Sequence, residues 1–179
     1  RFMWLTNSSI GKKVIMSVTG IALILFLTFH ACMNAVALIS PEGYNVVCSA
    51  LGANWYALVA TAGLGVLVVL HFVYAILLTL QNRKARGANR YAVVDKPAKV
   101  EWASQNMLVL GFIVVVGMLL HLYNFWFNMM FAELANSGYA YVGSSIHAND
   151  GAALIAYTFK CPVYSIIYLV WFVAIWFHI

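Results

Sequence analysis

Four apolar runs, each long enough to cross a lipid bilayer, constrain this chain more than any other feature of its sequence. They cover residues 14–39, 57–80, 107–131 and 162–179. A helix of about 20 apolar residues crosses a hydrocarbon core of roughly 30 Å, and these runs are apolar on all sides rather than along one face. Only 8% of the residues are charged, against about 25% in soluble domains. We therefore predict one domain, residues 1–179: an all-α integral membrane bundle with four transmembrane helices.

The two ends of the chain suggest that a longer protein has been trimmed. The sequence begins at Arg1 rather than at a methionine, and it stops at Ile179 inside an apolar run. We expect a further, fifth helix beyond the C-terminus. The three cysteines form no C-x-x-C pair and are expected to be free thiols; they are Cys32, Cys48 and Cys161.

Basic residues are distributed unevenly between the connections. Nine of the ten Lys and Arg residues precede the first run or lie in segment 81–103, and only Lys160 lies in another connection. Because positive charge marks the cytoplasmic side, the N-terminus and segment 81–103 are predicted to be cytoplasmic. That segment would dock a partner or face anionic lipid, whereas GAALIAYTF, residues 151–159, could lie along the opposite interface. Nucleic-acid binding is not expected, since it does not require four apolar spans.

Each of the four runs contains one histidine, and their depths fall into two levels. At about 1.5 Å per residue, His30 and His121 lie roughly 24 to 25 Å from the inner surface. The second and fourth runs travel inward, which places His71 and His178 about 15 Å below the first two. The sequence therefore predicts an outer pair, His30 with His121, and an inner pair, His71 with His178.

Facing imidazoles at one depth are the arrangement that a b-type haem with two axial histidines requires. Two such levels predict two haems stacked across the membrane. A single membrane histidine is more often a satisfied polar group or part of a proton relay. Zinc is disfavoured, because two histidines do not complete a tetrahedral site. The fifth histidine, His147, lies in an outer connection and is expected to be a surface residue.

Glycines inside the runs provide places where a flat macrocycle or a neighbouring helix can approach closely. The sequence contains five of them: Gly20, Gly63, Gly65, Gly111 and Gly117. The pattern is compatible with haem binding and equally with ordinary helix packing.

Three stretches carry a resemblance to a known family. The first is SSIGKKVIMSVTG, with His30 following it; the second is HFVYAILL, with NRKARGANRY following it; the third is WASQNMLVLGFIVVVGMLLHLYNFW. Together they resemble the dihaem cytochrome b membrane subunit of succinate dehydrogenase and fumarate reductase. The similarity extends over nearly the whole chain. It implies five transmembrane helices, with His30 and His121 holding the outer haem and His71 and His178 the inner one.

The resemblance also implies a role and partners. Such a subunit lies in the bacterial cytoplasmic membrane and passes electrons between menaquinone and a cytoplasmic iron–sulfur subunit, which serves a flavoprotein subunit. The dicarboxylate active site lies in the flavoprotein, so this chain would be an enzyme subunit without that site. Ser17, in the motif S-V-T-G, and Trp102 would lie near the propionates of the inner haem.

Two positions depart from the family. Trp176 stands where some members carry a proton-transferring glutamate, so that relay is absent here. Gln105 stands where members often carry a basic residue, which puts any charge contact there in doubt.

Quinone reduction requires a proton-exchanging group near the outer haem. Glu42, which follows the first run, is our candidate by analogy with a glutamate that the family carries near the outer end of its second helix. Asp150, Glu133 and His147 are rivals on the same side. Two other functions remain open. The chain could be the cytochrome b subunit of another membrane oxidoreductase, such as a hydrogenase or formate dehydrogenase, or it could be a haem-free, proton-coupled transporter.

Overall fold

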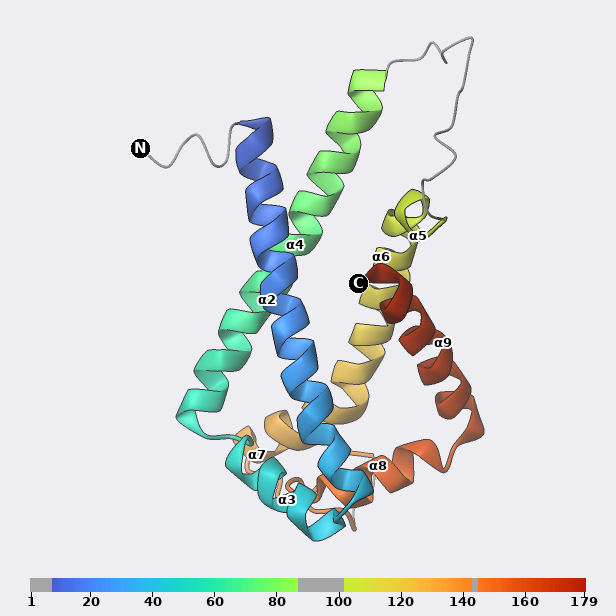
Figure 1. The fold of residues 1–179 in the computed structure, drawn as a ribbon. Coiled ribbons are helices and arrows are strands. Elements are labelled where there is room, and N and C mark those ends of the chain that lie inside the picture. Colours follow the sequence, from blue (N-terminus) through green and yellow to red (C-terminus); the bar gives the residue numbers. More distant parts are fainter. Residues whose placement is uncertain (1–7, 87–101, 143–144) are drawn as a thin grey trace.

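The computed structural model describes residues 8–86, 102–142 and 145–179, and these residues are predominantly helical (Figure 1). Three helical stretches are long and apolar enough to cross a membrane: Ser9–Leu38, Trp55–Ala85 and Met107–Leu134. A fourth span exists only if α8 (Gly151–Phe159) and α9 (Pro162–His178), which are bent by 100°, are counted together. The described part contains no strand, only an isolated bridge between Tyr139 and His147. The all-α prediction is confirmed, while the number of spans is three or four.

The first half of the chain forms one pair of antiparallel helices. Helix α2 (Ser9–Ala35) begins at Ser8, whose hydroxyl accepts a hydrogen bond from the Gly11 N–H at 2.9 Å, an N-cap that satisfies one of the free donors of the first turn. The short 3₁₀ helix η1 (Val36–Leu38) continues it, and α3 (Pro41–Ala50) turns across the end of the bundle. Helix α4 (Trp55–Arg86) then returns and packs along α2.

The second half forms another pair. A short helix, α5 (Trp102–Gln105), precedes α6 (Met107–His121), which continues without a break into the π-helix η2 (Leu122–Phe131) and then α7 (Ala132–Leu134). Helix α8 crosses the same end of the bundle as α3 and contacts it, and α9 returns along α6 (Figure 1). The direction of α8, almost perpendicular to α9, is the one expected of a segment lying along a membrane interface.

Contacts between helices are concentrated inside the pairs α2/α4 and α6/α9 and are sparse between the pairs. The edge-to-face contact of Phe72 with Phe112, with ring centroids 5.7 Å apart, is one that joins α4 to α6. Near the other end, the contact of α3 with α8 joins the first half of the chain to the second. The molecule is therefore two helix pairs connected mainly at one end.

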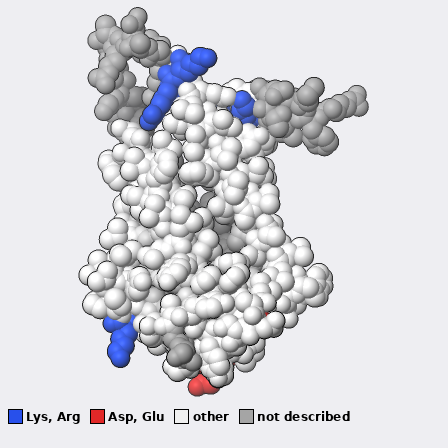
Figure 2. All heavy atoms as spheres, turned by 180° about the vertical axis from the view of Figure 1, so that it is seen from behind, with Lys and Arg blue, Asp and Glu red and all other residues white. Residues whose placement is uncertain are grey.

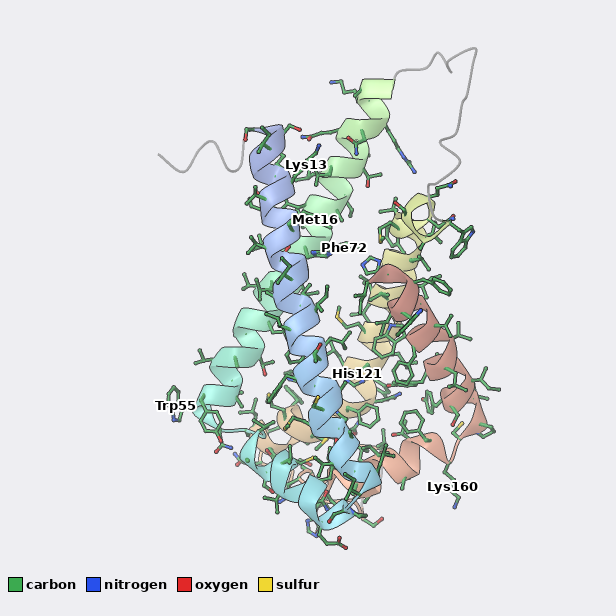
Figure 3. The ribbon with its side chains drawn as sticks, in the orientation of Figure 1. Lys13, Met16, Trp55, Phe72, His121 and Lys160 are labelled. Carbon is green, nitrogen blue, oxygen red and sulfur yellow. The ribbon has the colours of Figure 1, made fainter. Side chains whose placement is uncertain are left out.

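Helices α2 and α4 extend beyond the apolar runs at one end and include basic residues there. Helix α2 includes Lys12 and Lys13, and α4 extends past Arg83 and Lys84. Long cationic side chains can reach water while their stems cover apolar surface. Figure 2 shows basic side chains at both ends of the molecule, and Figure 3 labels Lys13 at one end and Lys160 at the other. The uneven charge distribution is thus present, although most of segment 81–103, residues 87–101, lies outside the described residues.

Candidate functional site

The structure brings the four histidines together as two facing pairs, one member from each helix pair. The imidazole of His30, on α2, lies 5.7 Å from that of His121, at the end of α6, measured between ring centroids. The imidazole of His71, on α4, lies 6.5 Å from that of His178, on α9. These are the two couples that depth alone assigned to common levels. Each couple therefore crosses the space between the two halves of the bundle.

These separations fit two imidazoles on opposite sides of one metal ion. With a metal–nitrogen bond of about 2 Å on each side, and with the distance from each ligating nitrogen to the centroid of its ring added, the two ring centroids lie roughly 6 Å apart. The ring planes are nearly perpendicular, at 89° for the outer pair and 81° for the inner pair. Rotation of a ring about the nitrogen–metal axis does not change the separation, so this orientation is compatible with axial ligation.

The hydroxyl of Thr19 contacts one imidazole of the inner pair, that of His71. Its hydroxyl lies 2.8 Å from the Ile15 carbonyl, 3.1 Å from the Met16 carbonyl and 3.0 Å from Nδ1 of His71. When the hydroxyl gives its proton to one of these two carbonyls, it accepts a bond from Nδ1–H of the ring. The proton is then on Nδ1, and Nε2 is left with the lone pair that a metal ligand needs.

Glycines lie against both rings of the inner pair. A Cβ at Gly20, on α2, would lie 3.3 Å from Cε1 of His71, and a Cβ at Gly111, on α6, would lie 3.1 Å from Cε1 of His178. Gly20 precedes His30 by ten residues, and Gly111 precedes His121 by the same interval. Ten residues correspond to about 15 Å of rise, which is the predicted separation of the two levels. Each helix that carries an outer-level histidine therefore also carries a glycine that contacts an inner-level one.

The remaining glycines predicted to allow close approach differ in role. Gly117 is buried against Trp171 of α9, where an added Cβ would overlap the indole ring. Gly63 and Gly65 have no atom within 4 Å of such a Cβ. Close helix packing thus explains Gly117, whereas Gly63 and Gly65 face open space in this structure.

The outer pair lies among aromatic side chains. The ring of His121 packs against Phe125 at 5.2 Å, Trp171 at 5.7 Å and Tyr168 at 6.3 Å, and His30 stacks on Phe26 at 5.5 Å (centroid distances). Figure 3 labels His121 near the middle of the molecule, and it is half-buried. Apolar surroundings favour neutral imidazole over imidazolium, and neutral imidazole is the ligating form.

The donor set fits a haem better than an ion held by protein ligands alone. In the part of the chain that the structure describes, no group of three or more His, Cys, Asp or Glu side chains converges. A tetrahedral zinc site needs four ligands, whereas a porphyrin supplies four of its own and needs only two axial ones. In addition, Nδ1 of His178 is buried and has no hydrogen-bond partner among the described residues. Paired rings with a glycine at each inner ring are compatible with a haem that takes two axial ligands, whereas Nδ1 of His178 lacks the partner that the Thr19 hydroxyl gives to Nδ1 of His71.

Ser17 and Trp102 lie on opposite halves of the bundle. Ser17 is exposed on α2, and Trp102, in α5, is 62% exposed with its ring edge-on to Phe177, the neighbour of His178. Thr19, the threonine of the motif S-V-T-G, had no predicted role, but its hydroxyl lies within hydrogen-bond distance of an inner histidine. Its spacing was the available signal: Thr19 and His30 are 11 residues, or three helical turns, apart, so they share a face of α2.

The acidic residues on the Lys160 side have different surroundings. Glu42 is exposed in the first turn of α3, where its Oε2 accepts a bond from the Ser40 hydroxyl at 3.2 Å. Asp150 caps α8, accepting from the Ala153 N–H at 3.0 Å and from Nδ2 of Asn45 at 2.8 Å. Glu42 and Asp150 line the same open pocket of about 530 Å³ between α3 and α8.

The two other rivals of Glu42 have structural contacts. Oε2 of Glu133 accepts a bond from the Ala53 N–H at 2.9 Å, which fixes the loop before α4. His147 is exposed and stacks on Tyr139 at 4.6 Å, as expected of a surface residue. Among the four candidates, Glu42 is the one that is exposed, at a pocket, and free of a backbone contact that the fold needs.

The cysteines are all within the described residues, and all three are free. Cys48, on α3, packs between Tyr44 and Gly151, and burial raises the pKa of both its thiol and the Tyr44 phenol. The Tyr44 hydroxyl donates to Oδ1 of Asn34 at 2.9 Å. This cluster holds α3 against α8 and the end of α2.

The fold and the distribution of apolar residues define a helical protein with at least three helices suited to crossing a membrane. Comparison with known proteins found no match among protein-family models, curated sequences or solved structures.

Proposed function

We propose that this chain is the haem-binding membrane subunit of a succinate:quinone oxidoreductase. The observation that carries the proposal is the pair of facing histidine couples at two heights, with each couple joining the two halves of the bundle. The motifs around His30, His71 and His121, which resemble the dihaem cytochrome b family, support it. The chain would lie in a bacterial cytoplasmic membrane with its N-terminus in the cytoplasm, because that end of the molecule is the basic one.

Haem b, when bound, supplies reversible one-electron transfer. The protein contributes position and electronic tuning. His30 and His121 would offer neutral ring nitrogens to the outer haem, and His71 and His178 to the inner one. By accepting a bond from Nδ1–H of His71, Thr19 would leave Nε2 available, an outer-shell contact of the kind that orients metal-bound histidines. Gly20 and Gly111 leave room beside the inner rings.

The partners follow from the same proposal. An iron–sulfur subunit would dock on the cytoplasmic end, which carries Lys12, Lys13, Arg83 and Lys84, and a flavoprotein subunit would carry the dicarboxylate chemistry. On the opposite side, menaquinone would exchange electrons with the outer haem, and the carboxylate of Glu42 would exchange protons with the quinone at the pocket between α3 and α8. The lipid bilayer surrounds the exposed apolar faces.

Haem content of the purified protein tests the proposal directly. Pyridine-haemochrome analysis is expected to give two b haems per chain, and the reduced spectrum should show the α band of bis-histidine haem. A colourless protein would favour the transporter alternative. Identification of the co-purifying soluble subunits would separate a succinate-linked complex from a hydrogenase or formate dehydrogenase.

Single histidine variants test the pairing. His71→Ala and His178→Ala should each lose the inner haem and keep most of the outer one, whereas His147→Ala, a matched surface control, should keep both. Equal loss of both haems from every paired-histidine variant would mean collapse of the bundle and would contradict separate sites.

Turnover with quinol tests the role of Glu42. Glu42→Gln removes the titratable group from an exposed position without removing a helix cap, so it should slow quinol-linked turnover while leaving both haem spectra unchanged. Unchanged turnover would refute the assignment of Glu42.

A further inference from the structure

The corner where α8 meets α9 contains a pocket that the proposed electron transfer does not use. Its volume is about 560 Å³, and it opens at the surface between η2, α8 and α9. The polar residues that line it are Tyr123, Asn124, Tyr157, Thr158, Lys160 and Tyr164. We propose that this pocket binds the phosphate of an anionic phospholipid headgroup; the inference requires that the chain spans a bilayer but does not depend on haem binding.

Positive charge at the pocket comes from two sources. Lys160 is exposed, is the one basic residue of the chain outside the N-terminal region and segment 81–103, and forms no salt bridge within the described ranges. Helix α9 begins beside it, with Pro162 in its first turn and no side-chain hydrogen bond from its N-cap, Cys161. The N–H groups of the first turn of α9 therefore lack a capping side chain, and an uncapped helix N-terminus attracts anions.

Buried polar groups face the same pocket. Thr158 is only 5% exposed, and its hydroxyl has no hydrogen-bond partner among the residues described. Asn124 is 4% exposed; its Nδ2 donates to the Tyr168 hydroxyl at 3.2 Å. Among the described residues the buried side-chain N and O atoms without a partner are Nε1 of Trp126 and Nδ1 of His178, so the unpartnered Thr158 hydroxyl is accessible from the pocket that it lines. It can donate to an acceptor oxygen of a ligand bound there. The Thr158 hydroxyl is thus a donor available to a phosphate oxygen.

The surroundings of the pocket suit a lipid rather than a free anion. Tyr123 and Tyr157 are 53% and 51% exposed at its rim, and tyrosine is enriched at the level of lipid headgroups. An exposed apolar stripe leads away from the pocket along one face of α9, with the spacing i, i+3, i+4 and i+7; its members are Val163, Ile166, Ile167 and Val170. A phospholipid could place its phosphate at the corner and its acyl chains along this stripe.

Photolabelling of the full-length protein in nanodiscs tests the proposal. A phosphatidylglycerol analogue with a photoactivatable group near the headgroup would be compared with the matching phosphatidylcholine analogue, and labelled peptides would be mapped. We expect labelling of residues 157–167 by phosphatidylglycerol in preference to phosphatidylcholine. Lys160→Gln should lower that labelling about fivefold, the effect of one basic residue at an anionic lipid surface, and Thr158→Val should lower it without any change in charge.

Controls make the result decisive. Lys13→Gln, at the opposite end of the molecule, should leave labelling of 157–167 unchanged, and unchanged helicity and melting temperature of each variant would exclude misfolding as the cause of a loss. Equal labelling by both lipids, or unchanged labelling in both pocket variants, would overturn the proposal. Competition by millimolar inorganic phosphate as strong as that by the lipid would assign the pocket to a free anion and would likewise overturn it.

Discussion

Replacement of Gly117 by alanine should loosen the pair α6/α9, although alanine is the better helix former. An added Cβ would overlap Cδ1, Cγ and Nε1 of Trp171, so the indole must move. Trp171 also donates from Nε1 to the Val114 carbonyl at 2.9 Å and packs against His121 and Tyr168. The substitution therefore disturbs a steric contact, a hydrogen bond between helices and an aromatic cluster together.

The magnitude follows from these parts. Overpacking costs about 1–3 kcal/mol, the loss of one hydrogen bond costs about 1 kcal/mol, and the disturbed ring contacts cost about 1 kcal/mol. The gain in helix propensity from glycine to alanine offsets about 1 kcal/mol. The expected net loss is about 2–4 kcal/mol in the free energy of unfolding.

The assay is reversible unfolding in mixed detergent micelles, followed by circular dichroism at 222 nm. Gly63→Ala is the matched control, because a Cβ at that position of α4 meets nothing within 4 Å and should be neutral or slightly stabilising. In a double-mutant cycle, Trp171→Ala should abolish most of the cost of Gly117→Ala by removing the obstructing ring. Equal stability of Gly117→Ala and Gly63→Ala, or additive effects in the cycle, would refute the reasoning.

Three further predictions concern other contacts. Gly151→Ala should destabilise the protein by about 1–3 kcal/mol in the same unfolding assay, since its Cβ would overlap Sγ of Cys48 and lie 2.9 Å from Cε1 of Tyr44; equal stability of variant and parent would contradict this. Cys48 should react with maleimide only at higher pH than an ordinary thiol, because burial raises its pKa and so lowers the thiolate fraction at neutral pH; a rate that rises with pH at the same point as a model thiol would count against it. Thr19→Val removes the hydroxyl beside Nδ1 of His71 and should weaken retention of the proposed inner haem alone, whereas Thr19→Ser should retain it. The loss of each haem can be followed by its absorbance during dilution into haem-free detergent. Loss of both haems at equal rates would point to a general packing defect.

The helical architecture could be predicted because it depends on the length and the apolar composition of each run, which are local properties of the sequence. A run of about 20 apolar residues satisfies its backbone only as a helix in lipid, and alternating direction follows from short connections. The histidine couples could be predicted for the same reason, since depth depends only on rise per residue and helix direction.

Features that depend on three-dimensional packing could not be predicted in this way. The π-helix after His121 and the 100° bend between α8 and α9 reflect how side chains such as Asn128 bond to the backbone and how α8 packs on α3. The same limit applies to Gly117 and Gly63, which are equivalent in sequence terms but have very different neighbours. Helix α3 was missed because its ten residues are too few and too polar to stand out from a loop.

The unequal joining of the two helix pairs has a consequence for how the molecule deforms. The contact of α3 with α8 lies near the couple of His30 and His121, so it would act as the hinge of any rotation of one helix pair against the other. The couple of His71 and His178 lies farther from it, beside the contact of Phe72 with Phe112. A small rotation about that hinge changes the wider couple most and the nearer one least. Thermal motion would therefore vary the ring separation of the inner couple more than that of the outer couple. The two couples would differ in mechanical stiffness although each consists of two histidines.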